Sequence, residues 1–104
     1  MSWDIILKAK REIILFETNI TYNLADMYYK CIDKELGLEK LDGLSSKKAL
    51  PIVKKAIKDM EDNKEEYKKL NPPNGWGSYD GLLRDLRNLK KSCEQIPDGV
   101  IEID

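Results

Sequence analysis

The feature that most constrains the fold is a helical repeat of apolar residues in three stretches of the chain, 23–36, 46–62 and 79–96. In each stretch apolar side chains recur at i, i+3, i+4 and i+7, which puts them on one face of an α-helix. The three stripes are Leu24, Met27, Tyr28, Cys31, Ile32 and Leu36; Ala49, Leu50, Val53, Ala56, Ile57 and Met60; and Tyr79, Leu82, Leu83, Leu86, Leu89, Cys93 and Ile96. Because such faces must be buried, a core of three helices is predicted.

Capping residues lie at the ends of these stretches. Asn23 is expected to cap the first helix and Ser78 the third, because their side-chain oxygens can accept from free backbone N–H groups. Either Ser45 or Ser46 caps the second helix. Gly37 is expected to end the first helix, since glycine readily adopts the left-handed conformation found there.

Both ends of the chain carry short runs of β-forming residues. Residues 4–8 and 12–18 are rich in Ile, Leu and Phe around a polar stretch, which predicts a β-hairpin. Apolar residues of the same segment also fit helical spacing, so a single helix is the alternative. Residues 100–103 follow Pro97-Asp98-Gly99, which stops the third helix, and are predicted to form a strand beside the hairpin. The predicted fold is α+β, with a three-helix core packed on a small antiparallel sheet formed by the N-terminal hairpin and the C-terminal strand.

Composition restricts the class of protein. The chain has 104 residues, which fits a single domain, 1–104. Its 18 basic and 19 acidic residues give a net charge of −1, which argues against a nucleic-acid-coating protein. We find neither an apolar stretch long enough to span a membrane nor the pattern of a signal peptide. A cytoplasmic protein is therefore expected, with no membrane partner.

Reactive side chains are few. The chain contains no histidine, which removes histidine-based acid–base catalysis and the usual zinc sites. Cys31 and Cys93 are the two cysteines, and we expect both to be reduced and to face the core. No phosphate-binding loop or cofactor motif occurs, so neither a cofactor nor a metal is expected, and catalysis is not favoured.

One candidate site begins in the segment 19–23. If this segment is extended, Asn19, Thr21 and Asn23 lie on one side of it, directly before a predicted helix N-terminus. Free N–H groups at such an end favour anions, which suggests a polar ligand cleft. The alternative is structural, with these side chains satisfying backbone groups of a strand end and a helix cap.

The second candidate segment is the loop 71–79, rich in proline and glycine. Trp76 lies between two glycines and could present its ring for stacking, or could instead fold inward and fill the core. We predict that Asn74, Trp76 and Tyr79 converge with Asn19 and Asn23, so that two helix N-termini face one polar cleft.

The second helix carries a partial stripe of lysines. Lys47, Lys54 and Lys58 share one face, Lys55 lies beside them, and three acidic residues follow closely. Such a mixed pattern is typical of a solvated helix face.

Four motifs occur in a fixed order: NITYN at 19–23, ALPIV at 49–53, NPPNGWGSY at 71–79 and PDGV at 97–100. In this order they resemble a family of small uncharacterised proteins encoded by bacteriophages and bacteria, over residues 13–104. The resemblance implies a phage- or prophage-type protein that works inside a bacterial cell. It carries over no catalytic residues.

The sequence thus favours a small non-catalytic protein that binds a host or phage protein. The alternative is a protein that binds or sequesters a small, nucleotide-like ligand. The partner's identity and any self-association into a homo-oligomer stay open.

Overall fold

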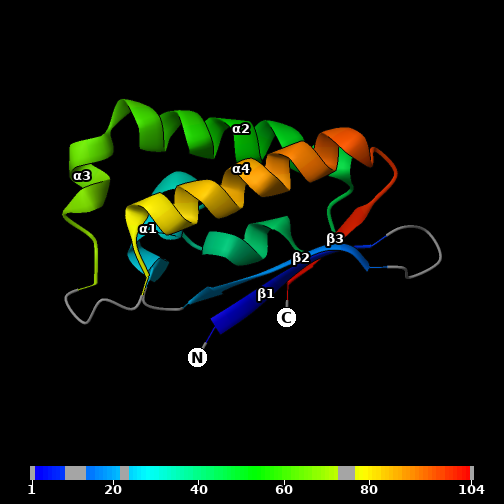
Figure 1. Cartoon of the computed structure of the whole chain (residues 1–104), viewed down its shortest axis with the longest axis horizontal. Helices are drawn as coiled ribbons and strands as arrows, with labels where there is room; N and C mark the ends of the chain where they lie inside the picture. The colour runs from blue at the N-terminus through cyan, green and yellow to red at the C-terminus, as the bar shows by residue number, and fades with distance from the viewer. Residues whose placement is uncertain (1, 9–13, 22–23, 73–76, 104) are drawn as a thin grey trace.

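The computed structural model describes residues 2–8, 14–21, 24–72 and 77–103. The elements are β1 (Ser2–Lys8), β2 (Ile14–Thr21), α1 (Ala25–Cys31), the 3₁₀ helix η2 (Gly37–Leu41), α2 (Ser46–Asp62), α3 (Lys64–Lys68), α4 (Tyr79–Gln95) and β3 (Val100–Ile103). The helices lie on one side of an antiparallel sheet with the strand order β2-β1-β3 (Figure 1). The α+β prediction is confirmed.

The N-terminal segment forms two strands, which decides between the hairpin and the single helix. β1 pairs with β2 from Ser2 opposite Thr21 to Lys8 opposite Ile14, and the register shifts once, between Leu7 and Lys8. Ile5 and Leu7 are fully buried, as expected for alternate residues on the face that the helices cover. β2 ends three residues later than predicted, so 19–21 belong to this strand.

The predicted C-terminal strand is also confirmed, and it lies between two partners. One edge of β3 pairs with β1. On its other edge the Ile101 carbonyl accepts from the Gly43 amide at 2.8 Å, and the Ile101 amide donates to the Leu44 carbonyl at 2.9 Å. The Ile103 amide donates to Asp42 Oδ1 at 3.0 Å. The residues before α2 therefore cover an edge that would otherwise expose unpaired backbone groups.

The first helix is shorter than predicted, since α1 ends at Cys31 instead of Leu36. Asp33 explains the early end, because its Oδ1 accepts from the amides of Glu35 and Leu36, both at 2.8 Å. A side chain that binds nearby amides in this way competes with the helical hydrogen bonds. Gly37 adopts the expected left-handed conformation, with φ of +57°, but it begins η2 instead of ending α1.

The caps of the two long helices follow the prediction. Ser45 Oγ accepts from the Lys48 amide at 3.3 Å and Ser78 Oγ from the Gly81 amide at 3.1 Å. Ser46 is buried instead, and its hydroxyl donates to the Gly99 carbonyl at 3.3 Å. The predicted cap Asn23 lies outside the described residues.

Burial largely confirms the three apolar stripes. Leu50, Ile32 and Ile96 are only partly buried, and Leu36 is exposed; the other stripe residues are buried. Cys31 and Cys93 are both buried and free, as expected. Among the described helices none is long and apolar enough to cross a membrane.

A substitution at Leu86 tests the assignment of the core residues. This side chain is fully buried on α4, so Leu86→Ala should lower the free energy of unfolding by about 2–5 kcal/mol through lost contacts and a residual cavity. Urea denaturation measures the change. Leu36→Ala removes the same atoms from a side chain that is 48% exposed and should cost less than about 1 kcal/mol. Equal losses in both variants would show that the core is assigned wrongly.

Gly99 tests the packing at the end of α4. A Cβ there would lie 2.7 Å from Leu7 Cδ1 and 2.9 Å from Ser46 Oγ, so Gly99→Ala should destabilise the fold by about 1–3 kcal/mol. In Gly81→Ala the Cβ meets only Ser78 Oγ, at 3.3 Å, inside a helix that favours alanine. Thermal unfolding should show a clear loss for the first variant and a smaller change for the second. A Gly99→Ala protein as stable as wild type would contradict this packing.

Candidate functional site

The predicted site residues are only partly placed by the structure. Asn19 and Thr21 lie in β2, where they stand opposite Asp4 and Ser2 of β1. Asn23, Asn74 and Trp76 lie outside the described residues. The convergence of the two motifs on one cleft therefore stays a prediction.

Tyr79 anchors the start of α4 to its neighbours. Its side chain is 2% exposed, and its hydroxyl donates to the Met60 carbonyl on α2 at 2.7 Å. Its amide donates to Asn71 Oδ1 at 2.8 Å. Burial raises the pKa of the Tyr79 hydroxyl, which keeps it neutral and in its role as a donor.

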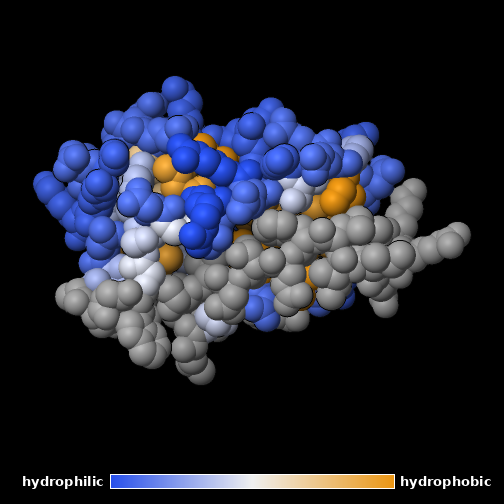
Figure 2. Space-filling view, in the orientation of Figure 1, coloured by the Kyte–Doolittle hydropathy of each residue, from blue (hydrophilic) through white to orange (hydrophobic). Residues whose placement is uncertain are grey.

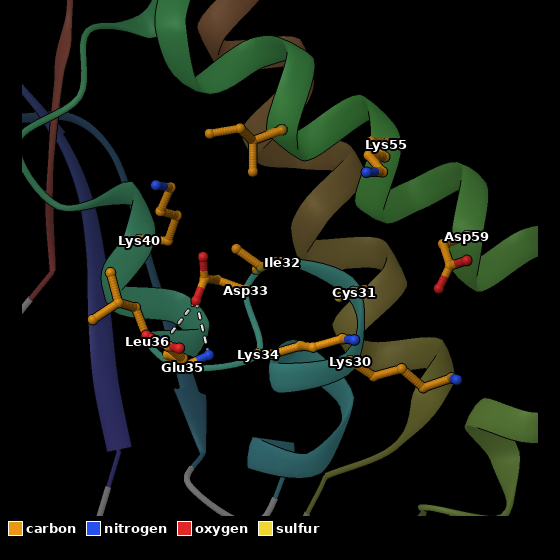
Figure 3. Close-up of a pocket in the computed structure, with 11 residues that line it drawn as sticks. Lys30, Cys31, Ile32, Asp33, Lys34, Glu35, Leu36, Lys40, Lys55 and Asp59 are labelled. Carbon is orange, nitrogen blue, oxygen red and sulfur yellow. Dashed lines mark hydrogen bonds between the residues drawn. The ribbon is translucent and has the colours of Figure 1, made fainter.

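A pocket of about 680 Å³ opens between α2 and the segment that joins α1 to η2 (Figure 3). We call it the lysine pocket; it is lined by Lys30, Cys31, Ile32, Asp33, Lys34, Glu35, Leu36, Lys40, Ile52, Lys55 and Asp59. Lys40 stands on η2 and Lys55 on α2, so they approach the pocket from different elements. Apolar side chains and cations from three segments thus line one hollow.

Two carboxylates of the pocket are held by groups of the protein itself. Asp33 is bound by two amides of its own turn, and these lower the pKa of its carboxyl. Asp59 Oδ1 accepts from Asn63 Nδ2 at 3.0 Å, and its Oδ2 accepts from the Tyr67 hydroxyl. Both carboxylates therefore serve local structure, which leaves them less free to bind a ligand.

The lysines of the pocket differ in how they are engaged. Lys30 lies 3.4 Å from a carboxylate oxygen of Glu66 and 5.5 Å from the centre of the Tyr67 ring. Lys34, Lys40 and Lys55 form no ion pair within the part of the chain that the structure describes. Lys34 and Lys55 are therefore available to an anion from outside, whereas Lys40 lies near enough to Asp33 for its charge to help lower the pKa of that carboxyl.

The cysteine in this pocket is not an activated nucleophile. Burial, with a smaller contribution from the Asp59 carboxylate, raises the pKa of Cys31 from 9.0 to about 12. The pKa of Cys93 is raised by burial too. Since the thiolate is the reactive form, neither thiol is set up for attack at neutral pH. Among the described residues no group of three or more His, Cys, Asp or Glu side chains could hold a metal ion.

Exposed apolar side chains occur beside the lysine pocket. The large hydrophobic side chains exposed in the described part are Leu36 at 48%, Val100 at 45% and Tyr29 at 37%. Tyr29 lies against Gly37, where an added Cβ would be 3.0 Å from its Cε1, and Leu36 is the residue before that glycine. Two of the three exposed side chains thus flank one turn. We call Tyr29, Ile32, Leu36, Lys40 and Lys55 the docking surface.

The residues of the docking surface were not assigned to a binding surface from the sequence. Leu36 was predicted to face the core, because it continues the apolar stripe of the first helix. Once Asp33 ends α1 early, the same residue comes to the surface. An Asp two and three residues before the freed amides is a signal that could have revealed this turn.

Scans of the chain against protein-family models, curated proteins and solved structures found no match. The docking surface therefore rests on the geometry of this chain.

The raised pKa of Cys31 predicts a pH dependence. The unfolded chain loses this proton near pH 9.0, whereas the folded chain keeps it until about pH 12. The contribution of this thiol to the free energy of unfolding should therefore be fully present below pH 9.0. Above pH 9.0 it should decrease by about 1.4 kcal/mol per pH unit. Urea titrations across this range measure the slope.

The stability of the Cys31→Ala variant should decrease less steeply with pH than that of wild type. Some decrease should remain, because the raised pKa values of Cys93, Tyr67 and Tyr79 act in the same direction. An unchanged slope in the variant would contradict the assignment.

Proposed function

We propose that this chain is a small non-catalytic binding protein that holds an acidic segment of a partner protein on the docking surface. The observation that carries the proposal is the exposure of Leu36 and Tyr29 around one turn, beside a pocket with unpaired lysines. Exposed apolar side chains lose contact with water when a partner covers them, and this stabilises the complex.

The charge of the surroundings supports an acidic partner. Four lysines line the pocket against three carboxylates, and two of these carboxylates, Asp33 and Asp59, are held internally. An apolar centre with a charged rim is the usual anatomy of a protein interface. Complementary charge at the rim speeds association and excludes partners of like charge.

The setting of the partner follows from the sequence. The four motifs resemble those of small phage and bacterial proteins, so the partner is a host or phage protein in the cytoplasm of a bacterial cell. Binding of this kind needs a surface and no reactive group, which agrees with the raised pKa of both thiols.

The alternative occupant is a small nucleotide-like ligand. A volume of about 680 Å³ lies within the range of ligand pockets, and lysines could contact its phosphates. The exposed Tyr29 does not line the pocket, so a ligand inside the pocket would leave this side chain uncovered. This favours the protein partner.

Affinity capture from a bacterial lysate tests the proposal. Wild-type protein should retain one protein specifically, and retention should weaken with rising salt because surface charges are screened. Leu36→Ser and Lys40→Glu should each abolish retention. Val100→Thr is the matched control, since Val100 is 45% exposed on β3, away from the docking surface.

Circular dichroism must show that each variant is folded. Loss of the captured protein in Leu36→Ser and Lys40→Glu, with retention in Val100→Thr, supports the proposal. Retention unaffected by Leu36→Ser contradicts it, as does the absence of any protein that depends on this residue. A bound small molecule found by native mass spectrometry in place of a protein would favour the alternative.

A further inference from the structure

A second basic surface lies along the line where α2 and α4 pack together. Two hollows of about 300 and 360 Å³ follow this line, and both are lined by Glu61 and Arg87. The larger is lined by Lys54, Ile57, Lys58, Glu61, Arg87 and Lys90, which we call the basic seam. It shares no residue with the lysine pocket. Figure 2 shows how hydrophilic side chains cover the helices, with small hydrophobic areas between them.

Positive charge prevails in the basic seam. Four cations, two from each helix, stand against the single carboxylate of Glu61, which leaves a net charge of 4 − 1 = +3 among the lining residues. Glu61 is already engaged, because Arg87 Nη2 donates to its Oε2 at 2.9 Å. Both side chains are about half exposed, at 54% for Arg87 and 49% for Glu61, so a competing anion can reach this pair.

The other pairings of these cations are weak. Lys58 lies 3.1 Å from Asp62 and Lys90 lies 3.3 Å from Glu94, each one helical turn away and open to solvent. Exposed pairs of this kind exchange easily with other ions. Lys54 forms no ion pair within the described ranges.

Basic and acidic residues are segregated along α2. Lysines occupy positions 47, 48, 54, 55 and 58, whereas the acidic residues stand at 59, 61 and 62. No acidic residue lies in the first turn and no basic residue in the last turn. This order opposes the helix dipole, which favours anions at the N-terminus and cations at the C-terminus. Because the dipole acts mainly within the first and last turns, Lys47 and Lys48 weaken α2 slightly, whereas Lys54 and Lys58 of the basic seam lie in the middle of the helix and do not.

We propose that the basic seam binds the phosphate chain of an oligophosphate ligand. A chain of linked phosphates can contact cations of both helices at once, which one carboxylate cannot, and it competes for them with Glu61, Asp62 and Glu94. The planar Arg87 guanidinium suits phosphate oxygens, and Lys54 and Lys90 supply point charges from the two helices. A bound phosphate displaces Glu61 from Arg87. This site is independent of the docking surface.

Isothermal titration calorimetry with sodium tripolyphosphate tests the proposal, and parallel titrations with ATP and adenosine distinguish the source of the phosphates. Tripolyphosphate and ATP should both bind, and adenosine should not. Equal affinities for the first two indicate a site for the phosphate chain alone, whereas tighter binding of ATP indicates that the nucleoside is also held. Absence of binding by both overturns the proposal.

Three variants test whether tripolyphosphate binds specifically to the residues of the basic seam or is only attracted by the charge of the surface. Lys54→Ala should raise the Kd for tripolyphosphate about tenfold. Lys91→Ala removes the same charge from an exposed position outside the seam and should change the Kd less than about twofold. Glu61→Gln should lower the Kd, because it removes the carboxylate that competes for Arg87. Equal effects of Lys54→Ala and Lys91→Ala, or weaker binding by Glu61→Gln, overturn the proposal.

Discussion

The structure depends on a close approach of three segments at Gly99. The Ser46 amide donates to the Gly99 carbonyl at 2.8 Å, and the buried Ser46 hydroxyl donates to the same oxygen. The Leu7 side chain also lies against Gly99, so close that a Cβ there would overlap both it and the Ser46 hydroxyl. The first residue of α2, the turn after α4 and the central strand β1 are therefore fixed together. This junction sets the direction of β3 and places both long helices above the sheet (Figure 1).

The two proposed binding surfaces lie on opposite flanks of α2 because of how this helix is packed. Its apolar stripe faces the core, which leaves Lys55 beside η2 and Lys54 and Lys58 beside α4. Each flank meets a different neighbour: a turn with exposed apolar side chains on one side, and Arg87 and Lys90 of α4 on the other. At the C-terminal end of α2, the Tyr67 hydroxyl donates a hydrogen bond to Asp59. One helix thus supplies cations to two chemically different surfaces.

Much of the fold could be predicted from the sequence because its signals are local. Apolar periodicity identified the core residues of α2 and α4, and Ser45 and Ser78 marked where these helices begin. The docking surface was not predicted, because the apolar repeat continues to Leu36 and conceals the turn in which Asp33 binds two amides. Leu38 and Leu41 are fully buried through the same change, although no periodic pattern included them. The basic seam needed tertiary structure too, since its charges come from helices that are distant in sequence.

The place of β3 between β1 and residues 42–45 has a consequence for the order of folding. The helices form from neighbouring residues, but β3 follows every other element and completes contacts that span nearly the whole domain. Such distant pairings are slow to form, because a long loop must close first. During synthesis, the edge of β1 and the backbone of 42–45 therefore stay without this partner until β3 has left the ribosome. A nascent chain halted after α4 would hold every helical sequence yet present two unfinished edges, and unpaired strand edges of this kind favour aggregation.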